Sequence, residues 1–260
     1  TGYPLTWTNL TKDAKIRIMN DANKGYLKML KQLTEMFTPK FLIPFASFAA
    51  LQHPDHFEYM KLTIHNTSKD VVDFFQNINI KIIDLIPGEF WDEKQKLIFR
   101  RQNREKFFEK EFLYDYLQKI HKQSIENKFI SHDFELSNEE VINYFETLNE
   151  SNVSKRVGDT SICLSIIDYN HLDHFLITFK KGKIVCMLIS KPVDSDLSIE
   201  CPRKIIQEII HNDLSWDEAH IGYWCKFSRK HNIYNIELWK LLHAPWKARK
   251  KYEKYILKTY

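Results

Sequence analysis

The chain has 260 residues, of which 43% are hydrophobic and 28% charged, and 38 Lys and Arg against 34 Asp and Glu leave a net charge of +4. This composition excludes a disordered, collagen-like or coiled-coil protein, and the length suits one large domain or two modest ones. Only six glycines are present and no GxGxxG or GxxxxGK(S/T) motif occurs, which excludes Rossmann and P-loop nucleotide binding.

Charge and cysteine usage bear on compartment and partners. The basic residues gather at Lys94–Lys110 and Lys247–Lys258, where acidic residues stand among them. Such mixed charge predicts solvated helix faces, so a nucleic-acid partner is not expected. No apolar run reaches the ~18 residues of a membrane span, and the first residues carry no recognisable secretory signal. The four cysteines form no CxxC pair, which favours reduced thiols, and we expect a cytoplasmic protein without a membrane partner.

The first part of the chain alternates helices and strands, as is typical of an α/β fold. Apolar residues at helical spacing predict a helix from about Thr11 to Phe37, which Pro39 ends. Phe41–Phe45 is a short apolar run of strand length, and Lys81–Leu85 is a second one. Between them a capping-box pattern predicts a helix over Thr67–Phe75. Two strands are too few for a self-sufficient sheet, so we expect that half of the sheet is supplied from elsewhere.

A change of pattern near residue 130 marks the boundary between two predicted domains, 1–130 and 131–260. We predict that a long helix over about Arg100–Lys128 bridges them, and that a capping box at Ser137 opens the next helix. Three apolar segments of strand length follow, Ser161–Ile167, Phe175–Phe179 and Ile184–Ile189, and the last two are joined by a hairpin turn at Lys181-Gly182-Lys183. Two helices, about Pro202–Asn212 and Ser215–Phe227, complete an α+β domain.

The sharpest local motif is Gln52-His53-Pro54-Asp55-His56, directly after a predicted buried strand. α/β folds place ligands at such strand ends, and imidazole and carboxylate groups suit zinc or iron. Pro54 stiffens the turn, so we predict at most one metal ligand from this stretch. The alternative is a loop histidine that caps the next helix.

Two other polar tracts are predicted to be structural. His171-Leu172-Asp173-His174 resembles half of a metallo-hydrolase motif, but it lies between two strands and favours a polar hairpin turn. Asp217 and Glu218 could form an acid/base pair, yet adjacent helical positions point about 100° apart. Helix capping explains both carboxylates better. The sequence singles out no catalytic residue, and the cysteines are expected to be packing residues.

The order of several short segments resembles the C-terminal region of the CMP-N-acetylneuraminate hydroxylase family and its bacterial relatives, which are metallo-β-lactamase-fold proteins. The matching segments are Thr1-Gly2-Tyr3-Pro4-Leu5-Thr6-Trp7, Ile43-Pro44-Phe45-Ala46-Ser47-Phe48, His53-Pro54, Leu214-Ser215-Trp216-Asp217-Glu218-Ala219-His220-Ile221-Gly222-Tyr223 and Ile233-Tyr234-Asn235. The second domain also resembles, more weakly, the sterol-carrier-protein-like domains appended to some members of this superfamily.

The resemblance implies a fold class of α/β plus α+β. Residues 1–130 would be the C-terminal half of a metallo-β-lactamase αββα sandwich, and residues 131–260 a smaller α+β domain. In that family an H-x-H-x-D-H motif and a further Asp supply most metal ligands, and a late His, matched here by His53, closes the site. The other ligands would precede Thr1, which we interpret as a cut point in a longer chain. Tyr3 and Trp7 would line the substrate pocket beside the metal.

The resemblance therefore implies a metal-dependent enzyme whose site is completed by a missing N-terminal half or by a separate chain. Two activities stay open. One is a monooxygenase of a nucleotide-activated sugar, with iron and an iron–sulfur partner domain. The other is a hydrolase with zinc that acts on a related small molecule. The alternative function is a non-catalytic binding or interaction module that uses the aromatic-rich segment from Trp216 to Trp246.

Overall fold

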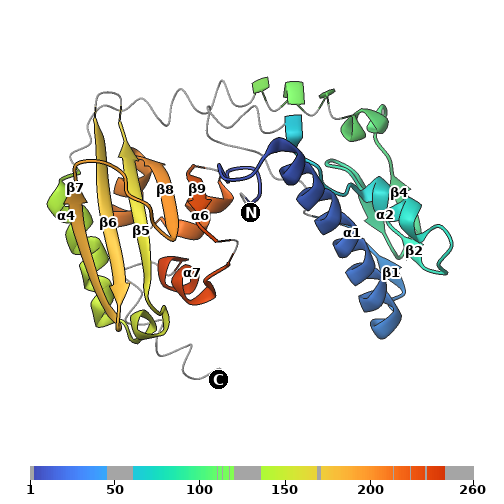
Figure 1. The fold of residues 1–260 in the computed structure, drawn as a ribbon. Coiled ribbons are helices and arrows are strands. Elements are labelled where there is room, and N and C mark those ends of the chain that lie inside the picture. Colours follow the sequence, from blue (N-terminus) through green and yellow to red (C-terminus); the bar gives the residue numbers. More distant parts are fainter. Residues whose placement is uncertain are drawn as a thin grey trace. The chain divides into compact units, whose positions relative to one another are not determined.

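The computed structural model describes residues 3–45, 61–109, 111–112, 114–116, 118–119, 136–168, 171–212, 214–222, 224–231 and 233–243. The chain divides into two compact units, Thr11–Ile125 and a second unit in which Thr1–Leu10 joins Glu126–Tyr260 (Figure 1). They are called here the 11–125 unit and the 126–260 unit, the latter including Thr1–Leu10. Helices and strands occur in both units, so the predicted mixed α/β character is confirmed.

Both helices predicted at the start of the 11–125 unit are present. α1 (Lys12–Phe37) begins after Thr11, whose side chain accepts a hydrogen bond from the backbone of the first turn. α2 (Ser68–Phe75) begins after Thr67, which forms the predicted capping box with Asp70. These caps satisfy backbone N–H groups that a helix leaves without internal partners, so the sequence sets both helix starts locally.

The strands of this unit are shorter than predicted. β1 (Phe41–Leu42) pairs in parallel with β2 (Lys81–Ile82), and the pair is a sheet of two strands in the described residues. β3 (Phe90–Asp92) and β4 (Leu97–Phe99) form a separate antiparallel hairpin that the sequence did not predict. Parallel strands normally occur in larger sheets with both faces covered, which makes the β1–β2 pair an unusual element.

The predicted helix over Arg100–Lys128 is wrong at its start. β4 ends at Phe99, and a 3-10 helix, η2, spans Arg104–Phe108. Helical backbone follows in the described residues between 111 and 119, and residues 120–128 lie outside the described part. The basic residues at the start of this range are held by hydrogen bonds to the preceding hairpin, as described below, and this competes with a continuous helix.

The 126–260 unit is built on one five-stranded sheet. Its strands lie in the order β7-β6-β5-β8-β9, with β5 antiparallel to β6 and parallel to β8 (Figure 1). The strands are β5 (Thr160–Ile167), β6 (Leu172–Lys180), β7 (Lys183–Ile189), β8 (Leu197–Pro202) and β9 (Lys226–Arg229). The predicted hairpin turn between β6 and β7 is confirmed, since Lys181 and Gly182 both adopt positive φ.

One face of this sheet carries the core of the unit. Side chains alternate along a strand, and Phe175, Ile177 and Phe179 of β6 all point to this face. The helices α4, α5, α6 and α7 contribute their apolar residues to the same core cluster. Those helices are α4 (Asn138–Glu146), α5 (Arg203–His211), α6 (Trp216–Ile221) and α7 (Ile236–His243), and the 3-10 helices η3 (Thr147–Glu150) and η4 (Asn152–Arg156) follow α4.

Two sequence predictions for this unit are corrected. The helix predicted over Ser215–Phe227 ends at Ile221, and β9 begins at Lys226. Gly222 occupies the C-terminal cap there, and its close contact with the Trp224 indole ring leaves no room for a side chain. β8 was missed because Leu197–Pro202 reads as the approach to a helix, whereas Pro202 ends a strand and caps α5.

Candidate functional site

The predicted substrate residues lie in the described part of the structure, whereas the predicted metal ligand does not. His53 and its neighbours lie within 46–60, outside the described residues, so the metal prediction stays a prediction. Tyr3 and Trp7 lie in the 126–260 unit, and Trp7 belongs to its core with 2% of its surface exposed. A substrate role for Tyr3 and Trp7 also stays a prediction.

Trp7 is held on several sides by aromatic and cationic groups. Its ring stacks on Phe227 at 5.5 Å between centroids, and Tyr3 meets it edge-on at 5.7 Å. The guanidinium of Arg229 lies 4.6 Å from the centre of the Trp7 ring. The backbone around it also pairs with β9, because Thr8 N–H donates to Phe227 O at 2.8 Å and Phe227 N–H donates to Thr6 O at 2.9 Å. These contacts make Trp7 a structural anchor of the chain's first residues.

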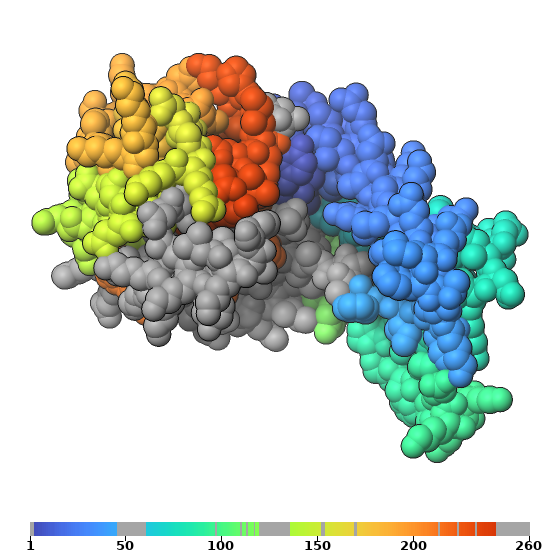
Figure 2. All heavy atoms as spheres, turned by 90° about the horizontal axis from the view of Figure 1, so that it is seen from below, coloured from blue at the N-terminus to red at the C-terminus, as the bar shows by residue number. Residues whose placement is uncertain are grey.

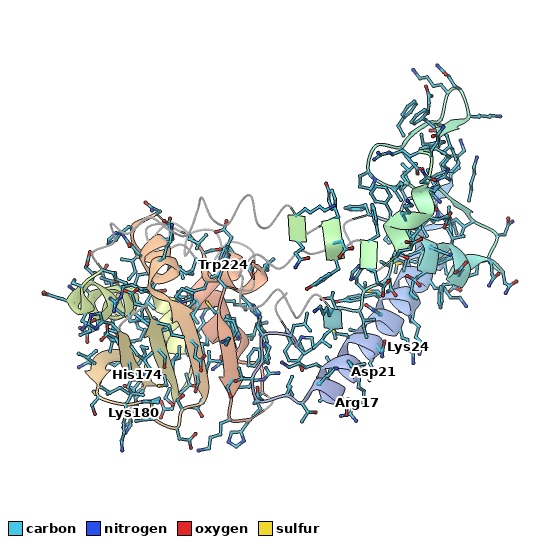
Figure 3. All side chains as sticks on the ribbon, turned by 90° about the horizontal axis from the view of Figure 1, so that it is seen from above. Arg17, Asp21, Lys24, His174, Lys180 and Trp224 are labelled. Atoms are coloured by element: carbon cyan, nitrogen blue, oxygen red, sulfur yellow. The ribbon has the colours of Figure 1, made fainter. Side chains whose placement is uncertain are left out.

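Three of the five aromatic residues described between Trp216 and His243 are buried, while Tyr234 is 55% exposed. Trp216 and Trp239 are buried, and the His220 ring contacts both Phe227 and Trp239. Trp224 is half-buried and lies beside α6 (Figure 3). In the described part of this segment, Trp216, Phe227 and Trp239 therefore serve core packing.

Glu218 of the Asp217–Glu218 tract takes the predicted capping role. Glu218 accepts hydrogen bonds from the backbone N–H and the hydroxyl of Ser215, at 2.8 and 3.0 Å, while the Ser215 hydroxyl accepts from Glu218 N–H. This reciprocal pair is the capping box of α6, so Glu218 is engaged in capping and an acid/base role for the tract is not supported.

The predicted turn at the His171–His174 tract holds for His171 alone, whose carbonyl accepts from Asp168 N–H at 2.9 Å in the connection between β5 and β6. Asp173 and His174 lie inside β6, because the strand starts at Leu172. His174 Nδ1 is 2.9 Å from Ser165 Oγ, and both residues are buried on the sheet face opposite the core. Asp173 pairs with Arg203, which also pairs with Asp168. The tract thus ties strand and helix together. The Ser165 and His174 backbones are paired in the β5–β6 ladder, which leaves no free N–H beside them to stabilise an oxyanion.

That outer face of the five-stranded sheet is amphipathic. β6 directs His174, Leu176, Thr178 and Lys180 toward it, and Leu172 and Met187 are about half exposed there, at 56% and 44%. Figure 3 shows His174 and Lys180 on this sheet. The described helices add no side chain from this face to the core cluster. Leu172 and Met187 are the exposed apolar residues of the face, whereas Ser165 and His174 are buried.

A cluster of charged residues follows the carboxyl end of β2. Glu89 accepts hydrogen bonds from Arg104 Nε at 3.0 Å and Arg100 Nη1 at 3.1 Å, and Arg104 Nη2 bonds Asp84 Oδ2 at 2.9 Å. The backbone N–H groups of Ile86 and Arg101 also donate to Glu89, at 3.1 and 3.0 Å. Sequence patterns placed these arginines on a solvated helix face, and the preceding acids Asp84 and Glu89 were the available indication of an internal pairing.

The cluster fixes the charge of its members. Burial acts to raise the pKa of Glu89, but the hydrogen bonds from Arg104, Arg100 and the backbone outweigh it and lower the pKa to about 2. Burial likewise opposes the charge of Arg104, and its bonds to Glu89 and Asp84 raise its pKa. Glu89 is therefore too weak a base for proton transfer near neutral pH, and its function is to hold the hairpin to the end of β2.

One carboxylate oxygen of Asp84 takes no part in the hydrogen bonds of this cluster. Asp84 Oδ1 is buried and has no hydrogen-bond partner among the described residues, while Oδ2 binds Arg104. A buried carboxylate oxygen without a partner is costly, and a cation or a donor from another segment would satisfy it. Within the described part of the chain, no three His, Cys, Asp or Glu residues stand close enough together to hold a metal ion.

The α1 helix carries an exposed apolar strip along its second half. The strip comprises five large side chains that are 39–69% exposed: Tyr26, Met29, Leu33, Met36 and Phe37. Their spacing of three, four, three and one residues puts them on one side of the helix. Charged residues occupy another side, where Figure 3 shows Arg17, Asp21 and Lys24 in a row. Figure 2 shows α1, in blue, at the surface of its unit. Such a strip is typical of a surface that packs against another element.

None of the helices in the described residues has the length and apolarity that a membrane crossing requires.

Comparisons with known proteins return structural likenesses only. No protein-family model matches the sequence, and no curated protein matches it. The chain is similar to a conserved hypothetical protein of Thermus thermophilus, a suggested sterol carrier protein, at 15% identity over 46% of this chain and 92% of that chain, with a TM-score of 0.37. It is also similar to palmitated SCP2L2 of Aedes aegypti, at 14% identity over 42% of this chain and 96% of that chain, with a TM-score of 0.33.

A third solved structure spans both units. The chain is similar to the inverting sec-alkylsulfatase Pisa1 of Pseudomonas sp. at 10% identity over 90% of this chain, with a TM-score of 0.32. The match covers 30% of the sulfatase, so this chain spans about a third of that enzyme's length.

Proposed function

We propose that the 11–125 unit is the C-terminal part of a metal-dependent enzyme of the metallo-β-lactamase fold, and that further polypeptide completes its sheet. The observation that supports this is the parallel β1–β2 pair in the same unit as the uncovered apolar strip on α1. Two short parallel strands do not form a stable sheet alone, because parallel sheets require several strands and cover on both faces. The unit therefore has the surfaces of a partial α/β layer.

The occupant of the apolar strip is a strand–helix layer, in the same chain or from a separate chain. The strip runs from Tyr26 to Phe37, which at 1.5 Å per residue is about 16 Å of helix. A length of this order matches a packed helix or strand better than a small molecule. No further strand pairs with β1 or β2 among the described residues, so the outer edges of this pair offer backbone groups to another strand of the same layer.

The metal site belongs at the carboxyl ends of β1 and β2. Asp84 follows the end of β2, and His53 follows β1 in the chain. α/β folds bind ligands at the carboxyl ends of parallel strands, which is why the proposal assigns both residues to this edge. The unsatisfied Asp84 Oδ1 suits a metal site in which Asp84 and His53 each supply one ligand and the completing polypeptide supplies the others. A divalent metal, iron or zinc, would supply Lewis-acid chemistry or activation of water or dioxygen there.

The substrate class that fits this proposal is a nucleotide-activated sugar or another phosphorylated or carboxylated small molecule. The metal identity separates the two activities: iron with an iron–sulfur partner domain supports hydroxylation, and a dinuclear zinc site supports hydrolysis. The substrate role predicted for Tyr3 and Trp7 is not part of this proposal, because Trp7 packs in the core of the 126–260 unit.

The test is the metal content of the natural full-length protein carrying His53→Gln, with His56→Gln as the matched control in the same loop. His53→Gln removes the ligand, so bound metal and activity are lost, whereas His56→Gln keeps both. Bound metal is counted by inductively coupled plasma mass spectrometry after gel filtration. Unchanged metal in the His53→Gln protein would overturn the site assignment.

The second candidate function is a binding module formed by the 126–260 unit. The observation that favours it is the amphipathic outer sheet face with Leu172 and Met187 exposed on the strands that the Lys180–Lys183 turn joins. The apolar residues of the face and the lysines of the Lys180–Lys183 turn would suit a partner segment that is apolar and flanked by acidic residues. Met187→Lys weakens such binding without loss of folding, because the side chain is 44% exposed. Trp239→Ala would not test it, because Trp239 is buried and its loss would destabilise the unit by about 3–5 kcal/mol, so that any loss of binding would also reflect the lower stability.

A further inference from the structure

Two of the four cysteines face each other inside the 126–260 unit. Cys225 Sγ lies 3.1 Å from Cys201 Sγ, with the Cys225 thiol as donor. Both side chains are fully buried, at 0% exposure, and both thiols are free. The proposed metal site and the outer sheet face involve neither of them.

The sheet register explains their proximity. β8 and β9 pair antiparallel, with Leu197 opposite Arg229 and Ile199 opposite Phe227. Continuing this register by two residues sets Cys201 directly opposite Cys225, with both side chains on the core face. Opposed residues in antiparallel strands have Cβ atoms about 4.5–5.5 Å apart, close to the separation that a disulfide needs.

The surroundings of Cys201 favour its protonated thiol. Burial, and after it the hydrogen bond and charge of Cys225, raise the pKa of Cys201 well above its ordinary value of 9.0. Because both side chains are fully buried, the pair reacts only with a small oxidant or during local opening of the unit.

We propose that Cys201 and Cys225 form a site for a reversible intramolecular disulfide that a hydroperoxide generates. One thiolate attacks the terminal oxygen of the peroxide, the O–O bond breaks, and a sulfenic acid forms while one water leaves. The second thiol attacks the sulfenic sulfur, the S–O bond breaks, and a second water leaves with the S–S bond formed. The two cysteines lose two electrons and two protons, and hydrogen peroxide is reduced to two waters. A dithiol reductant reverses the reaction by thiol–disulfide exchange.

The other two cysteines cannot substitute for this pair. Cys186 lies on the core face of β7, whereas Cys163 lies on the outer face of β5. The sheet itself separates their sulfur atoms, so they stay as thiols and serve as internal references.

The experiment treats the folded 260-residue chain with hydrogen peroxide, quenches it, and alkylates the remaining thiols with N-ethylmaleimide in denaturant. The expected product carries two alkyl groups, and its non-reduced digest contains one linked pair of peptides with Cys201 and Cys225. Dithiothreitol added before alkylation restores four alkyl groups. Four alkyl groups without reductant, a linkage between any other cysteines, or sulfinic acid in place of the link would each overturn the proposal.

Two variants distinguish disulfide formation between Cys201 and Cys225 from unspecific oxidation of the cysteines. Cys186→Ala keeps the loss of two alkylation sites, whereas Cys225→Ala abolishes the link and leaves Cys201 unlinked. Circular dichroism verifies that each variant is folded before treatment. If Cys225→Ala does not fold, the peptide map of the wild-type chain decides the question by itself.

Discussion

Replacement of Trp7 by alanine tests whether the first residues of the chain are an anchor or a pocket wall. Trp7 is 2% exposed and packs against Phe227, Tyr3 and Arg229. The hydrogen bonds between this segment and β9 are made by the backbone of Thr6, Thr8 and Phe227, so the substitution leaves them in place. The loss is therefore that of a buried indole and its ring contacts.

The expected cost follows from that environment. Truncation of a buried Phe or Trp to Ala costs about 3–5 kcal/mol, and we expect about 4 kcal/mol for Trp7. Tyr3→Ala, the matched control, removes a half-buried ring with an edge contact to Trp7 and costs about 1 kcal/mol. At about 1.4 kcal/mol per tenfold, the Trp7 loss speeds exchange through global unfolding roughly 1,000-fold.

Hydrogen exchange read by mass spectrometry provides the assay, because it isolates one unit of a chain that has two. The slowest amides of β5 and β6 report the free energy of unfolding of the 126–260 unit. We expect these peptides to exchange about 1,000-fold faster in Trp7→Ala and about 5-fold faster in Tyr3→Ala. Exchange of Trp7→Ala within about tenfold of the wild type would refute the anchor account and return Trp7 to the substrate pocket.

Three further predictions concern other parts of the chain. The pKa of Glu89 is lowered in the folded state to about 2, so its contribution to stability is full above its ordinary pKa of 4.5 and is lost as the pH falls through 2. We expect Glu89→Gln to reduce this loss of stability at low pH, measured by urea titration of the 11–125 unit at several pH values. The same pH dependence in the variant as in the wild type would show that the Arg104 pairing adds nothing. Because the Met36 side chain is 67% exposed, Met36→Lys changes the unfolding free energy of the isolated chain by less than about 0.5 kcal/mol. The substitution lowers the binding of an apolar dye to the strip on α1. Dye fluorescence equal to that of the wild type would mean that the strip is covered. The Cys201–Cys225 disulfide closes a loop with a sequence separation of 24, so we expect it to raise the unfolding free energy of its unit by about 3.5 kcal/mol. Denaturant titrations of the oxidised and reduced chain measure this difference. A lower unfolding midpoint for the oxidised chain would indicate a distorted sheet.

Local rules predicted the helix starts and the central hairpin well. Thr67, Ser137 and Ser215 each form the capping box that their spacing indicates, because such a motif involves residues only three positions apart. The Lys181-Gly182 turn joins β6 and β7 for the same reason.

Features that depend on distant partners could not be predicted. Arg100 and Arg104 were assigned to a solvated helix, and their actual partner, Glu89, comes from the other side of a hairpin. Leu197–Pro202 becomes a strand only because β5 and β9 flank it. Trp7 is buried by residues more than two hundred positions away, which no local pattern indicates.

The same distinction between local and distant information applies to the candidate site. The chemistry of His53 was readable from its motif, but its position lies outside the described residues. The unsatisfied Asp84 Oδ1 became visible only once the Arg104 pairing accounted for the other oxygen of that carboxylate. Sequence patterns identified residue types suited to a metal, and the fold supplied the strand edge that would gather them.

Native mass spectrometry of the protein isolated from its source cells tests the central claim most directly. The account predicts an assembly heavier than the 31.2 kDa of this chain by at least one further strand–helix layer, with a divalent metal retained in the folded particle. The additional mass would be a longer chain or a second chain, and tandem dissociation distinguishes them. A metal-free particle of 31.2 kDa would contradict the proposed enzyme and leave the binding module as the function of this protein.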